Sequence, residues 1–273
     1  MDRLSLKNIV KDNMIRLLKT EKTLYCVLDG NDFKEETLNI VIEENANVNL
    51  LLVNYRDDIA LQFELKEGSS LKIEGLLIEE KQSLNMKANL GTSAKITSYL
   101  ADLSSGDNNS NVVINLNGED SSAFWKLASI TEKKDKKVFD ISIIHNTPKT
   151  FGVSDNYGVT KGEGKLTFSG ISHIKNGSKF SKTRQTAKII VFDKLSNAKA
   201  QPILKIDENE VEASHGASVG TVNEDQIFYL TSRGLKEDMA RQLVTLGYLR
   251  PILDGFSDEE IKEEISTLIE RRM

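Results

Sequence analysis

A short phrase recurs through most of this 273-residue chain and constrains its fold more than any other feature. The phrase holds two small or turn-forming residues, then a variable residue, then an apolar one, as in Asn45-Ala46-Asn47-Val48 and Gly68-Ser69-Ser70-Leu71. Its apolar residue recurs at positions 48, 71, 96, 124, 180, 200 and 219. The period is therefore roughly twenty to twenty-eight residues, and the longest gap fits two periods with a degenerate middle marker.

Between these phrases the sequence predicts strands, and residues 59–66 carry a large apolar side chain at every second position. A β-sandwich also has frequent strands, but it has no reason to repeat its corner chemistry. A β-solenoid does, because its coils bury their apolar faces only by stacking and approach one another closely at the corners. We therefore predict a mainly β protein built as a β-solenoid.

The flanks of this region have a different period. Apolar residues between Ile9 and Leu18 have a helical spacing, so residues 1–20 are predicted to form a short helical lead-in to a β core at 21–222. Residues 223–273 are predicted to form a C-terminal helical domain. Its first helix is capped by Asn223 and ends at Gly234, a second covers about 236–246, and a third starts at Ser257 in a capping box.

Composition excludes several classes of function. The net charge is −5, which argues against a nucleic-acid binder that works by counterion release. A single cysteine, Cys26, allows neither an intrachain disulfide nor a thiolate-rich metal cage and suits a reducing cytoplasm. The N-terminus lacks the apolar core of a signal peptide, and the apolar runs are too short to span a membrane. We expect a cytoplasmic protein that binds no membrane.

Only one residue stands out as a candidate site. The histidines His145, His173 and His215 have no spacing typical of zinc ligands, and no nucleophile elbow or phosphate-binding loop is present. His215 lies in the run Ser214-His215-Gly216-Ala217, where small neighbours leave its imidazole uncrowded. It is either a corner histidine bonded to a neighbouring coil or an outward metal ligand or interface group. Phe228, Tyr229 and Trp125 are interpreted first as core aromatics.

These residues also resemble a known family. The segments 214–220 and 225–234, followed by Ala240-Arg241, are similar to the C-terminal signature of the SufB/SufD family, scaffold subunits of the SUF iron–sulfur assembly system. Other residues in the order of that family are His145, Thr150, Phe168-Ser169-Gly170-Ile171, Gln185 and Pro202-Ile203-Leu204-Lys205-Ile206.

The resemblance implies a right-handed parallel β-helix with a C-terminal helical domain, and a protein that catalyses no reaction itself. It implies pairing through the β-helix with a SufB-like subunit or a second copy, and docking of the SufC ATPase on the helical end. It also implies that His215 lies at the subunit interface, where a transient iron–sulfur cluster forms, with no cofactor held tightly by the isolated chain. The residues implied for partner binding are Phe228, Tyr229, Arg233, Gly234, Ala240 and Arg241.

Departures from the family pattern indicate which type of subunit the chain resembles. SufB-type chains carry acids beside the equivalent histidine and a cysteine after the glutamine, where this chain has Ser214, Gly216 and Thr186. Without a nearby thiolate the chain is expected to act as a SufD-like partner. Two alternatives stay open: a β-helix that binds or degrades polysaccharides, which the aromatic content of 6% disfavours, and a purely structural dimer.

Overall fold

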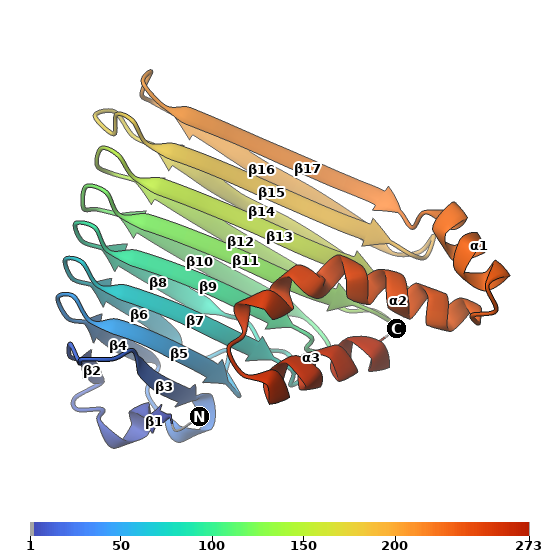
Figure 1. The fold of residues 1–273 in the computed structure, drawn as a ribbon, viewed down its shortest axis with the longest axis horizontal. Coiled ribbons are helices and arrows are strands. Elements are labelled where there is room, and N and C mark those ends of the chain that lie inside the picture. Colours follow the sequence, from blue (N-terminus) through green and yellow to red (C-terminus); the bar gives the residue numbers. More distant parts are fainter. Residues whose placement is uncertain (1–2, 273) are drawn as a thin grey trace.

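Two parallel β-sheets face each other and form a β-helix, and helices lie across one sheet (Figure 1). The computed structural model describes residues 3–272. The chain alternates between the sheets, so that odd-numbered strands build one sheet and even-numbered strands the other. Every pairing between the named strands is parallel. The predicted β-solenoid is therefore confirmed.

The strands lengthen from the first coils to the last. The odd-numbered sheet contains β1 (Leu4–Ser5), β3 (Leu24–Asp29), β5 (Asn47–Val53), β7 (Ser70–Leu77), β9 (Lys95–Asp102), β11 (Ser122–Thr131), β13 (Phe151–Thr160), β15 (Lys182–Val191) and β17 (Glu212–Thr221). The even-numbered sheet contains β2 (Met14–Leu17), β4 (Thr37–Ile42), β6 (Ala60–Leu65), β8 (Asn85–Leu90), β10 (Asn108–Leu116), β12 (Lys136–His145), β14 (Lys165–Ile174) and β16 (Asn197–Ile206).

The register of the paired strands gives the number of residues in each coil. Val48 pairs with Leu71 and Leu71 with Ile96, as the recurring phrase predicts. In the later coils Gly152 pairs with Thr183 and Thr183 with Ala213, so the spacing grows to about thirty residues as the strands lengthen. The two shortest predicted intervals were wrong as coil lengths, because position 200 lies in β16 and position 219 in β17, on opposite sheets.

Small residues occupy the corners, as predicted. The corner residues Ala46, Ser69, Ala94 and Ser121 are each at most 1% exposed. Each carbonyl accepts a backbone hydrogen bond from the next coil, for example Ala46 from Ser70 and Ser69 from Lys95. A larger side chain at these positions has no room between coils that stack about 4.8 Å apart. The recurring phrase thus marks the positions where the coils stack most closely.

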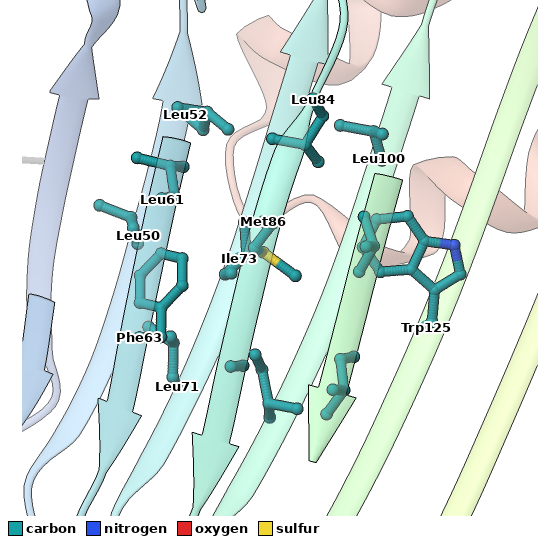
Figure 2. Packing of buried hydrophobic residues seen from close by; sticks show 14 of the residues in the cluster. Leu50, Leu52, Leu61, Phe63, Leu71, Ile73, Leu84, Met86, Leu100 and Trp125 are labelled. Carbon is teal, nitrogen blue, oxygen red and sulfur yellow. The ribbon is translucent and has the colours of Figure 1, made fainter. Parts of the chain in front are cut away.

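The core lies between the two sheets and is apolar through most of its length. Leu50 and Ile73 from the odd-numbered sheet meet Phe63 and Met86 from the even-numbered sheet, with Trp125 beyond them (Figure 2). Burial of each such side chain contributes about 1.5–3 kcal/mol. Trp125 is 2% exposed, which confirms its interpretation as a core aromatic.

Gly170 is required where β14 passes close to β12 in the even-numbered sheet. It has φ +147°, and a Cβ atom added there would lie 1.9 Å from the carbonyl oxygen of Ile141. The ladder between β12 and β14 is interrupted at this level, and the amide of Ile171 donates instead to the hydroxyl of Ser142 over 3.3 Å. The glycine lets β14 stack on β12 without a side-chain clash.

The predicted lead-in helix over residues 9–18 was wrong. Leu6–Asn8 form a single 3₁₀ turn, η1, and Met14–Leu17 form β2, in which Ile15 and Leu17 are buried. A segment this short fits either period, and pairing with β4 decides in favour of the strand. A second 3₁₀ turn, η2 (Gly30–Asp32), follows β3.

Three helices follow β17, in broad agreement with the prediction. They are α1 (Glu224–Ser232), α2 (Glu237–Leu249) and α3 (Glu259–Arg271), with a 3₁₀ segment, η3 (Arg250–Gly255), between the last two. Asn223 caps α1 by accepting from the amides of Asp225 and Gln226, as predicted. The expected capping box at Ser257 was wrong, because Asp258 caps α3 and Ser257 bonds to the β-helix instead.

The third helix is fastened to the β-helix at both ends. At its start, the buried carboxylate of Glu74 accepts from the amide and hydroxyl of Ser257, over 3.0 and 2.6 Å. At its end, the guanidinium of Arg272 donates to Asp135 over 2.7 Å and to the carbonyl of Leu103 over 2.8 Å. Between them the apolar side chains of α3 pack on the odd-numbered sheet, with Ile265 and Ile269 fully buried.

Candidate functional site

The last coil of the β-helix is open. Strand β17 ends the odd-numbered sheet and pairs only with β15 among the described strands, so its other edge carries unpaired backbone groups. Every residue of β17 is exposed, whereas alternate residues of β15 from Thr183 to Ile189 are buried beneath it. Apolar side chains at this end are correspondingly uncovered, with Val219 46% exposed.

His215 lies on this open coil. It pairs in register with Gln185, whose side chain points into the β-helix. Side chains at paired positions of adjacent parallel strands share a face, so the imidazole also faces the interior, at the level where the interior meets solvent. Gly216 beside it has no atom within 4 Å of the place a Cβ would take. His215 therefore lies within a strand and not at a corner, and its imidazole is exposed because no further coil of the described chain covers the inner face, not because it points outward.

The other two histidines are engaged elsewhere. His145 is fully buried in the β-helix, and its Nδ1 lies 2.7 Å from the hydroxyl of Thr150, which in turn lies 2.8 Å from that of Ser181. His173 lies on the outer face, with its Nε2 2.6 Å from Asp207. That hydrogen bond holds the pKa of the exposed Asp207 carboxyl below its usual value.

The single thiol lies far from this end. Cys26 is in β3, near the N-terminal end of the stack, and is fully buried. Burial raises the pKa of its thiol to about 11, so it is protonated at neutral pH. Among residues 3–272 no group of three His, Cys, Asp or Glu side chains is placed to hold a metal ion. Within the described residues, His215 has no companion ligands from its own chain.

The helical end presents an apolar face. Phe228 is 73% and Tyr229 57% exposed, so their interpretation as core aromatics was wrong. Tyr229 lines a hollow of about 450 Å³ together with Leu243 of α2 and Ile190 at the end of β15. Phe228 of α1 and Met239 of α2 are exposed on the same two helices. This face is unpartnered and rich in aromatic and large apolar side chains, the composition that typifies interface cores.

The remaining residues predicted for partner binding have mixed positions. Arg233 stacks over the ring of Tyr229 at 5.3 Å and is exposed, as is Gly234 with φ +95°. Arg241 lies over Phe192 at 5.4 Å and bonds to Glu237. Ala240 is fully buried in a small cluster that joins α1 to α2, so in this structure it supports the exposed face instead of contacting a partner.

A trough of about 600 Å³ crosses the outer face of the odd-numbered sheet beside the helices. Two of its rings, Phe124 and Tyr99, lie under lysine ammonium groups at 5.1–5.8 Å. Its carboxylates, Asp155 and Glu212, are each paired with a cation, over 3.1 and 2.7 Å. A polysaccharide-cleaving site needs two carboxylates free for acid and nucleophile or base. The trough therefore does not favour that alternative.

Comparison with known proteins identifies the family. The family described as "SUF system FeS cluster assembly, SufBD core domain" matches residues 16–248. The chain belongs to this family. The match spans the β-helix and most of α2, which includes both the open end and the apolar helical face.

Individual relatives agree. The iron-sulfur cluster assembly protein SufD of Bacillus subtilis (strain 168) is 31% identical over 183 residues, 67% of this chain and 42% of that protein. SufD of Escherichia coli (strain K12) is 27% identical over 115 residues, 42% of this chain and 27% of that protein. A SufBD family protein of Mycobacterium leprae (strain TN) is 33% identical over 115 residues, 42% of this chain and 13% of that protein. The chain spans less than half the length of these relatives.

Two features of this SufBD-family chain were not found by sequence reasoning. The apolar face includes Met239 and Leu243, whose spacing of four residues on a helix was a usable signal. The position of Gln185 under His215 was not predictable from spacing alone, because it depends on a coil of thirty residues. The structure also contains no helix long and apolar enough to cross a membrane among the residues it describes.

Acid is expected to weaken the SufBD-family fold through His145. Burial, with a smaller contribution from His173, lowers the pKa of its imidazole from 6.5 to about 4. Between these two pKa values the unfolded chain binds more protons than the folded chain. The stability that depends on a neutral His145 is therefore complete above pH 6.5 and is lost as the pH falls toward 4. By pH ~4.5 the loss is roughly 2–3 kcal/mol. Urea unfolding above pH 6.5 and at pH ~4.5 measures this loss of free energy. His145→Gln should remove this part of the pH dependence. If the variant keeps the wild-type pH dependence, the assignment to His145 is contradicted.

Proposed function

We propose that this chain is a scaffold subunit of iron–sulfur cluster assembly that pairs through the open end of its β-helix and presents His215 at the seam. The observation that carries the proposal is the uncovered last coil. Its edge has unpaired amides and carbonyls, and its inner apolar face, including Val219, is exposed. Such an edge is a template for another strand. A partner β-helix placed end to end supplies both the strand and the missing cover.

Ligand chemistry decides the kind of partner that this proposal favours. Iron–sulfur clusters are held chiefly by cysteine thiolates, with histidine as an occasional replacement. This chain offers one exposed imidazole at the open end, and its only thiol is buried in β3. A second copy brings another imidazole and no thiolate. A SufB-type partner that brings a cysteine to the seam makes a mixed ligand set, in which this chain is the SufD-like member and the cluster is the product assembled.

The apolar face of α1 and α2 is proposed to dock a SufC-type ATPase. The support is its exposure together with the fastening of α3, which holds the helices on the β-helix at Glu74 and Arg272. Because these contacts fix the helices on the β-helix, a movement of the docked ATPase during ATP turnover is transmitted to the β-helix. In this role the chain transmits motion and positions a ligand, and it catalyses no reaction itself.

Docking gives a direct test of the assembly role. Phe228→Asp replaces the exposed aromatic ring of Phe228 on α1 by a carboxylate, and large aromatic residues typically dominate the binding energy of an interface. We expect the affinity for the SufC-type ATPase to fall about 100-fold or more. Leu18→Asp is the matched control, because Leu18 is a similarly exposed apolar residue after β2, in the first coils at the other end of the stack. Titration of the purified ATPase measures both; equal affinities for the two variants would place the docking surface elsewhere.

A further inference from the structure

One buried polar atom beneath the open end has no partner. The side chain of Gln185 is only 4% exposed, and its Oε1 accepts no hydrogen bond from the described residues. Leaving a buried acceptor unsatisfied costs about 1–3 kcal/mol. Such an atom is expected to accept from a donor side chain that can turn toward it.

The neighbouring polar groups in the same column are already committed. Ser154 pairs with Gln185 one coil below, and its hydroxyl accepts from the side-chain amide of Asn156 over 3.2 Å. Asn156 in turn accepts from the indole of Trp125 over 3.1 Å. Asn156 thus links Trp125 to Ser154. Gln185 keeps an acceptor free, and it lies directly below the last strand.

The residue above Gln185 is His215. The two are paired in register on adjacent parallel strands (β15 and β17 in Figure 1), so their Cα atoms are separated by about one strand spacing, ~4.8 Å. Their side chains share the inner face. An imidazole always has at least one N–H to donate, whereas an amide oxygen can only accept. The two groups are complementary in chemistry and in position.

We propose that Gln185 is a positioning residue for His215: its Oε1 accepts the imidazole N–H and turns the lone pair of the other ring nitrogen toward the open end. This rests on the proposed function and deepens it, because a histidine ligand must present a neutral, unprotonated nitrogen in a fixed direction. Hydrogen bonding of the second nitrogen fixes both the tautomer and the ring orientation of such a ligand.

The tautomer of His215 tests the proposal without any cluster. Full-length chain labelled with ¹⁵N in its histidines is measured by NMR at about pH 8.5, where a solvent-exposed imidazole is neutral. We expect one dominant tautomer in the wild type and a severalfold larger minor population in Gln185→Leu. Thr183→Val is the matched control, since Thr183 is on the same strand and face and its hydroxyl is also unpartnered. Its His215 tautomer should match the wild type.

The outcomes separate this inference from the function on which it rests. The same tautomer populations in Gln185→Leu and wild type would overturn the positioning role, even if His215→Ala impairs cluster assembly. A shifted tautomer in both Gln185→Leu and Thr183→Val would also overturn it, because the effect would then be general loosening of the coil. A tautomer shift confined to Gln185→Leu supports it, whatever the iron content of the His215→Ala complex.

Discussion

Replacing Asp102 with alanine is expected to lower the free energy of unfolding by about 3–5 kcal/mol, the range measured when one partner of a buried ion pair is removed. The Asp102 carboxylate and the Lys137 ammonium group are fully buried, and they lie 2.6 Å apart. Burial lowers the pKa of Lys137, which reflects how strongly its charge depends on compensation. Without the carboxylate, that charge is left in the interior with only the carbonyl of Ser104, 2.7 Å away.

Urea unfolding followed by circular dichroism measures this effect. For a chain of this size it corresponds to a drop of roughly 10 °C or more in the melting temperature. Asp32→Ala is the matched control, because it breaks the exposed Lys7–Asp32 pair and is expected to cost less than ~1 kcal/mol. The double variant Asp102→Leu with Lys137→Leu should recover most of the loss, since no charge is then buried alone. A loss for Asp102→Ala as small as that for Asp32→Ala would contradict the prediction.

Replacing His215 with alanine is expected to leave the fold intact and to reduce the iron and sulfide content of the reconstituted complex by at least about tenfold, because the seam loses a ligand. Stability should change little, because every residue of β17 is exposed and the substitution opens no cavity. The complex is purified after co-expression with a SufB-type partner and the ATPase, and iron and acid-labile sulfide are then assayed against protein.

His173→Ala is the control for this experiment. His173 is also a histidine of the last coils, but it lies on the outer face of the even-numbered sheet and is bonded to Asp207. Its removal should leave iron and sulfide near wild-type levels. If the two variants hold equal amounts of iron and sulfide, whether both high or both low, the specific role proposed for His215 is contradicted.

Much of the β-helix could be predicted because its signal is local and repeated. Ala46, Ser69 and Ala94 each stand at a corner that the sequence marks with the same residue types. The lead-in segment could not be predicted, because four residues such as 14–17 carry no unambiguous period. Their assignment as a strand depends on β4, which provides the template for pairing more than twenty residues later.

The site was predictable in part for a similar reason. A run of small residues around His215 indicates an uncrowded imidazole, and the exposed β17 agrees with it. Residue type alone could not place Phe228 and Tyr229, because an aromatic residue on a helix is equally suited to a core and to an unpartnered face. The pairing of Gln185 with His215 requires the register of two strands, which no local pattern contains.

End-to-end pairing is the central claim, and native mass spectrometry of the co-expressed complex tests it most directly. Val219→Lys places a charge on the exposed inner face of the last coil, with Leu18→Lys in the first coils as a control. We expect wild type and Leu18→Lys to give a complex that contains this chain and a second SufB/SufD-type chain, and Val219→Lys to lose that second chain. Retention of the full complex mass by Val219→Lys would contradict pairing through the open end.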